Sequence, residues 1–306
     1  MKKVLILGAN SYIGNSFQKY IGENYNDQYE VHKVSLRGEA WKEDDWSGYD
    51  SILNVTGKAH ADIGILTEEQ KQEYYAVNCD LACEAAQKAV KDGVGQYIYL
   101  SSVIVYGDSS NGGGAIHITK DTKPAPSNFY GDSKWQAEQK LQVLFEELKE
   151  DDGKNNTALA IVRPPMIYGK NSKGNFKMLV KLADKVPVFP NVKNERSMLY
   201  VENLAEFLYL LIESQKSGVF LPQNASCVTT AQMVAAIATA KGKNAHLCNW
   251  MNLTDIIVAL AKKMPGKIGG MAGKAFGSMV IEQELSRKEI DGYQRFGLKD
   301  SVERSV

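Results

Sequence analysis

Short apolar runs alternate with longer helical segments along the first 169 residues, and this alternation limits the fold more than any other feature. Runs of strand type stand at residues 2–9, 30–36, 49–57, 95–107 and 157–169. Helical segments stand between them at residues 11–24, 67–94 and 133–150, and the second of these ends at a glycine stop. Strands that alternate with helices form right-handed βαβ units. The sequence therefore predicts an α/β protein with a parallel sheet and helices on both of its faces.

The pattern loosens after Gly169. Residues 197–214 have the pattern of one more strand and helix, which we expect to return to the same sheet. The rest of the chain is less regular and includes a Gly- and Lys-rich stretch at 262–278. For this stretch we expect packing or a contact in a homodimer, with a membrane-surface element as the alternative. The predicted division places residues 1–168 with 197–222 in a main domain, and residues 169–196 with 223–306 in a smaller mixed part.

The composition is that of an ordinary globular protein, with 44% hydrophobic and 24% charged residues. Because the formal net charge is zero, no global field attracts nucleic acid or an anionic membrane. No run approaches the ~18 apolar residues of a membrane span. The apolar start at Val4–Leu7 is too short for a signal peptide. These features predict a cytoplasmic protein with no nucleic-acid partner and no membrane span.

The cysteines are few and scattered, and they are Cys79, Cys83, Cys227 and Cys248. The first two stand four residues apart in an Ala-rich helical segment, where small buried thiols are expected. Together with four scattered histidines they supply too few ligands for a metal site. We therefore predict that the protein holds no metal and works in a reduced, cytoplasmic environment.

A glycine-rich turn, GANSYIG at residues 8–14, joins the first strand to the first helix. A turn of this kind lets backbone amides and a helix N-terminus approach a pyrophosphate. Ser11 stands where such a turn usually has its middle glycine, and its hydroxyl is able to donate to a phosphate. The turn lies between a strand and a helix at the start of the chain, as a dinucleotide-binding fold requires.

A tyrosine and a lysine, Tyr130 and Lys134, stand four residues apart at the start of a helical segment. Their side chains share one helix face. A nearby ammonium group stabilises phenolate and lowers a phenol pKa from ~10, which makes Tyr130 a candidate general acid or base. Ser101 and Ser102 end a strand at the carboxyl edge of the sheet, where ligands bind. The Ser102 hydroxyl would orient a substrate oxygen.

A second pair, Tyr29 and Lys33, has the same spacing. It lies in a strand-like run, where residues i and i+4 are roughly 13 Å apart. No serine pair accompanies it, so we expect no catalytic role for this pair.

These features occur in an order that resembles the extended short-chain dehydrogenase/reductase superfamily, and within it the NAD-dependent epimerase/dehydratase family acting on nucleotide sugars. The resemblance spans nearly the whole chain. Its segments are GANSYIG, NVTGKAHA, YYAVNCDLACEAA, YIYLSSVIVYG, FYGDSKWQAEQKL, IVRPPMIYG and NERSMLYVENLAEFL. It implies a Rossmann-type doubly wound sheet that binds NAD or NADP, with a smaller, mixed C-terminal part that binds the substrate. GKAHA, RPPMIYG, NERSMLYVENL and FGSM are most similar to bacterial UDP-sugar 4-epimerases and 4-ketoreductases of surface-polysaccharide pathways.

Position by position, the resemblance implies a catalytic set of Ser102, Tyr130 and Lys134, with Lys134 also holding the nicotinamide ribose. The pyrophosphate cradle that it implies consists of Gly8, Ser11, Tyr12, Ile13 and Gly14. The further cofactor contacts that it implies are Val55, Thr56, Gly57, Asn78, Ser101 and Pro165. Asn175 and Arg196 are implied in binding the nucleotide diphosphate, Arg196 as a charge-assisted donor. A surface salt bridge is the alternative for Arg196.

One departure from the family pattern concerns the cofactor. Ser35 stands where NAD-preferring members carry an acidic residue at the end of the second strand, and Arg37 follows two residues later. Arg37 offers a charge-assisted contact to a ribose 2′-phosphate, which favours NADP over NAD. The alternative is a solvated Arg37, with Asp44 or Asp45 at the adenosine end of the cofactor.

The predicted activity is that of a nucleotide-sugar 4-epimerase or 4-ketoreductase, with a UDP-hexose as the expected substrate. Val103 and Ile104 stand where the family's 4,6-dehydratases have an Asp–Glu pair, so a dehydratase is disfavoured. The alternative from another class is a non-catalytic NADP-binding regulator of the same superfamily. The complete Ser–Tyr–Lys set argues against that alternative.

Overall fold

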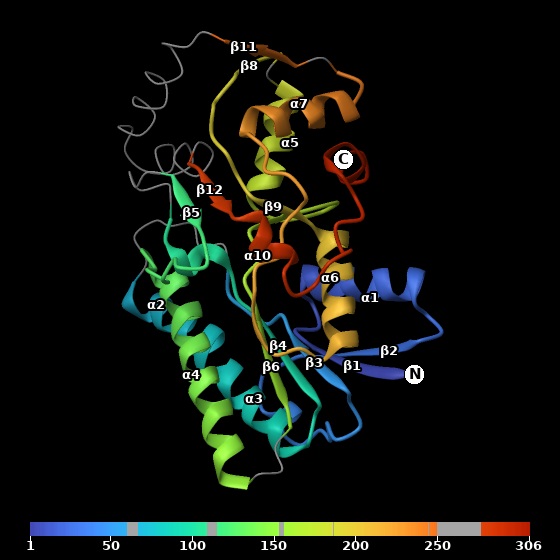
Figure 1. Ribbon diagram of the computed structural model, residues 1–306, viewed down its shortest axis with the longest axis vertical. Coiled ribbons are helices and arrows are strands. Elements are labelled where there is room, and N and C mark those ends of the chain that lie inside the picture. The colour runs from blue at the N-terminus through green and yellow to red at the C-terminus, as the bar shows by residue number, and fades with distance from the viewer. Residues whose placement is uncertain (60–66, 109–114, 153–155, 186, 244, 250–276) are drawn as a thin grey trace.

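The computed structural model describes residues 1–306 apart from 60–66, 109–114, 153–155, 186, 244 and 250–276. A parallel sheet of six strands lies at its centre (Figure 1). In order across the sheet, the strands are β10 (Gly218–Phe220), β6 (Ala158–Val162), β4 (Gln96–Leu100), β3 (Ser51–Asn54), β1 (Lys2–Leu7) and β2 (Tyr29–Val34). Helices lie on both faces of this sheet, so the predicted α/β class with a doubly wound parallel sheet is confirmed.

Successive residues of β1 point to opposite faces of the sheet, and each face has its own core. Val4 and Ile6 belong to the core beneath helices α1 (Tyr12–Asn24) and α6 (Val201–Ser214). Leu5 and Leu7 belong to the core beneath α3 (Leu81–Lys91) and α4 (Phe129–Asp152). In Figure 1 α1 and α6 lie above β1 and β2, and α3 and α4 lie at the lower left, on the other side of the sheet. The inner strands β3, β4 and β6 are therefore mainly apolar because both of their faces are covered, whereas β2 at the border of the sheet carries charged residues.

The strand order places a topological switch point between β1 and β3. From β1 the chain crosses to β2 on one side, then returns to β3 on the other side and continues outward to β4, β6 and β10. The connection after β1 thus runs toward β2, and the connection after β3 runs in the opposite direction, toward β4. In open α/β sheets a crevice forms there, outside the carboxyl ends of the strands, and ligands bind in it.

The helix expected over residues 67–94 is divided by a π-helical turn. Its first part, α2 (Glu68–Tyr75), begins at a capping box in which the Thr67 hydroxyl and the Gln70 side chain each accept a backbone N–H of the other residue. The π-helical turn covers Ala76–Asp80 and leads directly into α3. Such turns are often found at functional sites, where the extra residue turns a side chain inward.

The strand within residues 197–214 does not return to the main sheet, so that expectation is wrong. β9 (Met198–Tyr200) pairs instead with β7 (Met166–Tyr168), and the strand that joins the main sheet is β10, after α6. The cause lies at Pro164 and Pro165, which follow β6 and have no backbone N–H for the ladder. The chain leaves the sheet at this point, and β7 forms a separate ladder.

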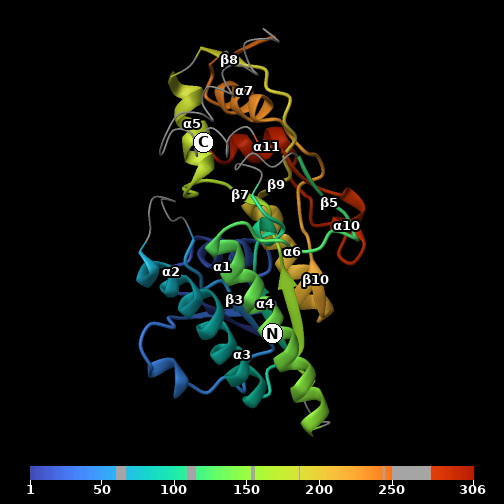
Figure 2. The ribbon, with the colours of Figure 1, turned by 90° about the vertical axis from the view of Figure 1, so that its left-hand side faces the viewer.

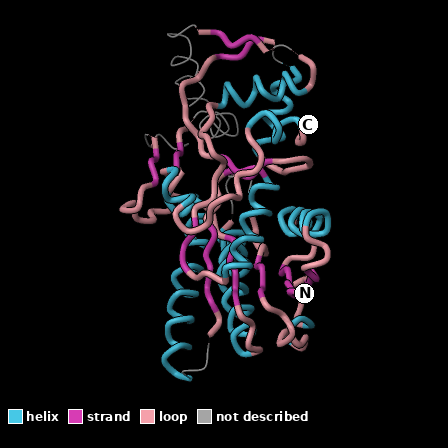
Figure 3. The backbone as a smooth tube through the Cα atoms, turned by 45° about the vertical axis from the view of Figure 1, so that its right-hand side comes forward, coloured by secondary structure: helices cyan, strands magenta, loops and turns pink. Residues whose placement is uncertain are grey.

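The smaller part of the molecule lies above the sheet in Figure 2, around helices α5 (Asn175–Lys185), α7 (Thr230–Ala240) and α11 (Leu298–Glu303). Its short strands β8 (Val188–Pro190) and β11 (His246–Cys248) form one parallel pair. β5 (Ile116–Ile118) and β12 (Met279–Ile281) form another, and α10 (Gln283–Arg287) follows it. Two short 3-10 helices, at Ala40–Lys42 and Val103–Tyr106, complete the described elements. Figure 3 shows the same arrangement by secondary structure, with the main strands enclosed by helices.

The predicted division into two parts stays a prediction. Ile290 and Tyr293, which we assigned to the smaller part, are buried in the core beneath α1 and α6. The stretch 262–278 lies almost wholly outside the described residues, and only its last two residues, Gly277 and Ser278, are described. Within the described residues no helix has both the length and the apolar character needed to cross a membrane.

Candidate active site

The glycine-rich turn brings the backbone of β1 and α1 close to the switch point. Gly8 has a φ of +112°, and a Cβ atom there would lie 3.3 Å from the Thr56 Oγ1 atom. A Cβ atom on Gly14 would lie 2.8 Å from the Cγ2 atom of Ile6, so only glycine lets α1 pack this closely on the sheet. Ser11 caps α1, since its Oγ accepts from the Gly14 N–H at 3.4 Å. Tyr12 and Ile13, the first two residues of α1, are half-buried.

The loop after β3 lies between this turn and the helix that carries Lys134. Val55 packs in the core, and the Thr56 N–H donates to the Asn54 side chain at 2.9 Å. The Thr56 Oγ1 is buried and has no hydrogen-bond partner within the described residues. A Cβ atom on Gly57 would lie 3.2 Å from the Lys134 Nζ. The Thr56 hydroxyl, which lacks a partner within the described residues, thus lies between two glycines, Gly8 and Gly57, that leave the backbone open to close approach. This arrangement fits a ligand that comes near the backbone and offers a polar atom to the hydroxyl.

Asn78 sits in the π-helical turn and is fully buried. Its Oδ1 accepts from the Lys58 N–H at 2.7 Å, and its Nδ2 donates to the Lys58 carbonyl at 3.1 Å and to the Ser133 Oγ at 3.0 Å. Asn78 therefore fixes the loop that contains Gly57 and joins it to α4. Sequence reasoning placed Asn78 along the cofactor path, but it missed Ser133, because a contact over 55 residues leaves no local signal.

The structure brings Ser102, Tyr130 and Lys134 together at the carboxyl edge of the sheet. Ser102 follows β4 and caps the short helix at Val103–Tyr106, where its hydroxyl accepts from the Ile104 N–H at 3.3 Å and lies close enough to the Tyr130 phenol to lower the phenol pKa. Tyr130 is in the first turn of α4, and its ring meets the buried Tyr74 ring edge-on at 6.3 Å. Lys134 follows one turn later, and its Nζ donates to the Leu100 carbonyl at 2.9 Å.

The ionisation of these groups is governed by burial. Burial raises the pKa of Tyr130 to about 12, with Tyr74 acting in the same direction and the Ser102 hydroxyl in the opposite one. The lowered phenol pKa that we expected from Lys134 is not found, because the Lys134 Nζ lies against the Leu100 carbonyl and over the Tyr99 ring, 4.6 Å from its centroid. Burial lowers the pKa of Lys134 to about 8, and the Glu138 carboxylate acts in the opposite direction.

A buried ion pair that the sequence did not reveal lies directly behind these residues. Glu138 and Arg163 are joined by two hydrogen bonds from the Arg163 Nε at 3.0 and 3.1 Å and by a further contact from Nη2. The Ser101 hydroxyl also donates to Glu138. Ser101, which we expected to contact the cofactor, is thus buried and bonded to protein. Pro165, two residues after Arg163, is buried as well.

Ser35 and Arg37 lie beside the glycine-rich turn, as the NADP hypothesis requires. The N–H groups of Gly8 and Ala9 both donate to the Val34 carbonyl, which ties the turn to the end of β2. The Ser35 Oγ accepts from the Arg37 N–H at 3.3 Å, and both side chains are exposed. Within the described residues the Arg37 guanidinium makes no ion pair or hydrogen bond.

The alternative residues for the adenosine end are also exposed. The Asp45 carboxylate accepts from the Ser47 N–H at 2.9 Å, and this bond lowers its pKa. Asp45 is thus committed to its own loop, whereas Arg37 keeps all its donors for a ligand.

The residues implied in substrate binding lie in the smaller part of the molecule. Asn175 is the first residue of α5 and is half-buried. Arg196 exchanges backbone hydrogen bonds with Val228 at 3.1 Å. Burial lowers the pKa of its side chain, and the Asp108 carboxylate raises it. Arg196 is half-buried, and Asp108 is a charged neighbour that sequence reasoning missed.

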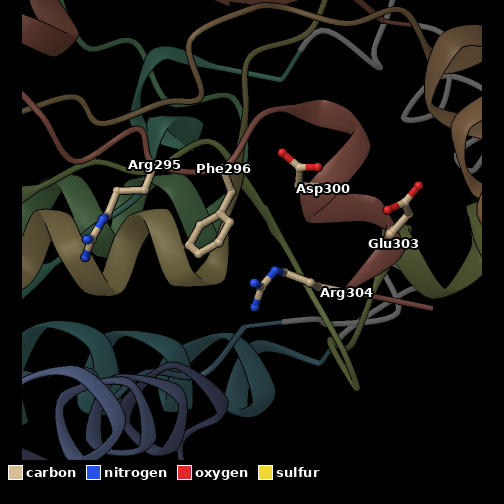
Figure 4. Close-up of a pocket in the computed structure, with 5 residues that line it drawn as sticks. All are labelled: Arg295, Phe296, Asp300, Glu303 and Arg304. Carbon is tan, nitrogen blue, oxygen red and sulfur yellow. The ribbon is translucent and has the colours of Figure 1, made fainter.

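An open hollow of the surface lies apart from this set (Figure 4). Its lining comes from the C-terminal residues Arg295, Phe296, Asp300, Glu303 and Arg304. Arg295 pairs with Glu206, and Arg304 pairs with Glu202 and lies over the Phe296 ring. None of the predicted site residues lines this hollow, and its arginines serve to fasten the C-terminal segment to α6. No cluster of three metal-ligating side chains occurs among the described residues.

The region of the chain that holds the candidate site matches a protein family. Residues 4–221 match the model of the NAD dependent epimerase/dehydratase family. The chain belongs to this family. Apart from the first two residues of β1, the match covers the six strands of the main sheet, and it includes the glycine-rich turn and the three catalytic candidates.

Two curated relatives show the same likeness. The UDP-glucose 4-epimerase of Vibrio cholerae is 31% identical over 200 residues, which is 63% of this chain and 57% of the relative. The N-acetyl-alpha-D-glucosaminyl-diphospho-ditrans,octacis-undecaprenol 4-epimerase of Escherichia coli O157:H7 is 26% identical over 229 residues, 70% of this chain and 64% of the relative. The matched region thus spans less than two thirds of either relative's length.

The fold is shared along nearly the whole chain. The solved structure of a UDP-N-acetylglucosamine 4-epimerase from Bacillus cereus superposes with a TM-score of 0.73 at 14% identity. The superposition covers 99% of this chain and 97% of that one. The likeness in fold therefore continues beyond residue 221, where the family match ends.

Proposed function

We propose that the protein is an NAD(P)-dependent nucleotide-sugar 4-epimerase or 4-ketoreductase. The observation that carries the proposal is the position of the Ser102 hydroxyl beside the Tyr130 phenol, one helical turn from the buried Lys134, at the edge of the switch-point crevice. A hydroxyl, a phenol and an ammonium group are what proton transfer at a sugar hydroxyl needs. The names of the two curated relatives support C4 of the sugar as the reacting carbon.

The crevice residues support a dinucleotide as the cofactor. The close backbone approach at Gly8 and the N-terminus of α1 suit a pyrophosphate. The orphaned Thr56 hydroxyl and the Lys134 ammonium group would hold the adjoining ribose. When bound, such a cofactor supplies the hydride acceptor and donor for C4.

The protein's own part is the transfer of the C4 hydroxyl proton. In the reductive direction Tyr130, a neutral phenol with a pKa of about 12, gives its proton to the substrate oxygen as C4 gains hydride. Ser102 orients the same oxygen, and for the Lys134 ammonium group to stabilise the phenolate that remains, its Nζ must turn from the Leu100 carbonyl toward Tyr130. In the oxidative direction the phenolate must form first and then takes the hydroxyl proton. An epimerase uses both directions, with hydride returning to the other face of the sugar.

Two rival functions lack support in this site. A 4,6-dehydratase needs further acid and base groups beside C5 and C6, and Val103 and Ile104 offer only hydrocarbon. A regulator that only senses NADP needs the crevice but has no use for a buried phenol beside a serine hydroxyl and a lysine.

Besides a nucleotide diphosphate, there is a second candidate for the group to which the sugar of the substrate is attached. The relative from Escherichia coli, whose match covers the larger share of this chain, is named for a sugar joined to undecaprenol through a diphosphate. A lipid-linked sugar diphosphate and a nucleotide sugar share the sugar and the diphosphate. Parallel assays with UDP-N-acetylglucosamine and with its undecaprenyl diphosphate counterpart, at equal concentration, distinguish the two classes.

The proposal is tested by Tyr130→Phe, with Tyr29→Phe as the matched control. General acid–base catalysis contributes ~10²–10⁴-fold, so turnover of a UDP-hexose should fall by this amount in Tyr130→Phe, while the cofactor affinity stays the same. Tyr29 is buried and donates to Glu213 far from the crevice, so Tyr29→Phe should lower stability by about 1 kcal/mol and leave turnover unchanged. Activity of Tyr130→Phe near the wild-type value would refute the assignment.

A further inference from the structure

Glu138 carries a buried carboxylate that has no role in the proton transfer proposed above. It stands one helical turn after Lys134 on α4, and its residue has no exposed surface. A charged group in such a place needs a partner, and Arg163, also buried, supplies it through the hydrogen bonds described above. Replacement of such a pair by apolar residues often leaves stability unchanged or higher. Stability alone is therefore a weak reason for placing this charge beside Lys134.

The contacts of the pair join three separate parts of the site. Glu138 belongs to α4, which also carries Tyr130 and Lys134. The Ser101 hydroxyl, which donates to Glu138, immediately precedes Ser102 at the end of β4. Arg163 follows β6. The pair thus fixes the helix that carries the phenol and the ammonium group to the strand end that carries the serine.

Arg163 is itself held rigidly in place. Its Nη1 donates to the Tyr106 hydroxyl at 2.5 Å. The guanidinium lies over the Tyr106 ring at 5.1 Å and over the Trp135 ring at 5.6 Å. Because every side of the cation is occupied, the Glu138 carboxylate is held in one place, and its distance from Lys134 is fixed.

We propose that Glu138 is a positioning residue of this active site: held by Arg163 and Ser101, its carboxylate keeps Lys134 in the charged form and fastens α4 to the strand end that bears Ser102. The inference rests on the proposed function, since Lys134 matters through Tyr130. It assigns a role to a side chain that touches neither substrate nor cofactor.

The surroundings of Lys134 identify Glu138 as the carboxylate that acts on it. The titratable and charged groups near Lys134 are Tyr130 and Glu138 on α4, Tyr99 on β4, Lys58 after β3, Cys79 in the π-helical turn and Arg163 after β6. Of these, Glu138 is the carboxylate that opposes the effect of burial on the Lys134 pKa. An ammonium group is charged below its pKa and loses its charge as the pH rises through it, here at about 8. Without Glu138 this loss should begin at lower pH.

The decisive measurement is the titration of Lys134 by NMR, with ¹³C at the lysine Cε and Lys134→Arg to assign the signal. In Glu138→Gln, which keeps the shape and removes the charge, we expect Lys134 to titrate about one pH unit below the wild type. Glu138→Asp keeps the charge and should restore most of the shift. In the enzyme assay, the alkaline fall of kcat should move to lower pH by the same amount in Glu138→Gln.

The same Glu138 variants also test whether this residue has a purely structural role. If Glu138 only braced the fold, Glu138→Gln would lower the melting temperature and leave the Lys134 titration where it is, and that result would overturn the proposal. If Glu138→Gln does not fold, the double variant Glu138→Met with Arg163→Met removes both charges and leaves apolar packing. Because Arg163→Met alone removes only the cation, Lys134 should titrate at lower pH in the double variant than in Arg163→Met, and equal titrations of these two variants would again be contrary. The titration needs no substrate, so it decides this inference even if the protein turns over no sugar.

Discussion

At the scale of single residues, the site consists of groups whose neighbours could not be read from the chain. The sequence placed Ser102, Tyr130 and Lys134 on the right elements, because strand ends and helix starts have local signals. It gave the wrong direction for the Tyr130 pKa, since the Lys134 Nζ is bonded to the Leu100 carbonyl. That bond joins residues 34 positions apart, and a contact over such a distance leaves no trace in local spacing.

Arg37 gives the sharpest prediction at this scale. Its side chain is exposed beside the glycine-rich turn, and it has no partner within the described residues, so it can bind the 2′-phosphate that distinguishes NADPH from NADH. Arg37→Ala should weaken NADPH binding about tenfold or more, in keeping with the ~1.5–3 kcal/mol of a charge-assisted hydrogen bond, and leave NADH binding unchanged. Calorimetric dissociation constants for both cofactors check this. Equal losses for the two would contradict it.

At the scale of elements, the sequence predicted the alternation of strands and helices but not every pairing. Each of the five early strand-like runs overlaps a strand of the main sheet, because strands buried on both faces are rich in apolar residues, although β2 at the border also carries charged ones. The pairing of β9 with β7 could not be predicted, since three apolar residues fit any ladder and the choice depends on where Pro164 and Pro165 send the chain. The π-helical turn at Ala76–Asp80 was equally hidden, because its sequence is typical of an ordinary helix.

The close packing of helix α1 on the sheet can be tested by substituting two glycines of this helix. A Cβ atom on Gly14 would meet Ile6 at 2.8 Å and Val55 at 3.2 Å, whereas Gly22 of the same helix has nothing within 4 Å. Gly14→Ala should push α1 off the sheet, lower the free energy of unfolding by about 1–3 kcal/mol and weaken cofactor binding.

Gly22→Ala is the matched control. It should raise the free energy of unfolding by about 0.5–1 kcal/mol, because alanine restricts the unfolded chain and suits a helix interior. Urea unfolding curves compare the two variants. A stabilised Gly14→Ala would show that α1 can move without cost.

At the scale of the whole molecule, the C-terminal segment closes the core beneath α1 and α6. Tyr293 has no exposed surface, packs edge-on against Phe207 at 5.1 Å and donates through its hydroxyl to the Gln223 carbonyl at 2.9 Å. Tyr293→Ala should lower the free energy of unfolding by about 3–5 kcal/mol. Val143→Ala, at an exposed position of α4, should change it by less than about 0.5 kcal/mol. Denaturant titration of both variants checks this, and similar values for the two would contradict it.

The six-stranded order also determines how copies of this chain can meet. The last strand on one side is β2, which presents Glu30, His32 and Lys33, with exposed charge along a ladder open to solvent. The last strand on the other side is β10, which offers only three residues and begins at Gly218, whose φ is +127°. Charged or very short border strands are a known protection against strand addition. A dimer of this protein is therefore expected to form through helical surfaces, and its two sheets should remain separate.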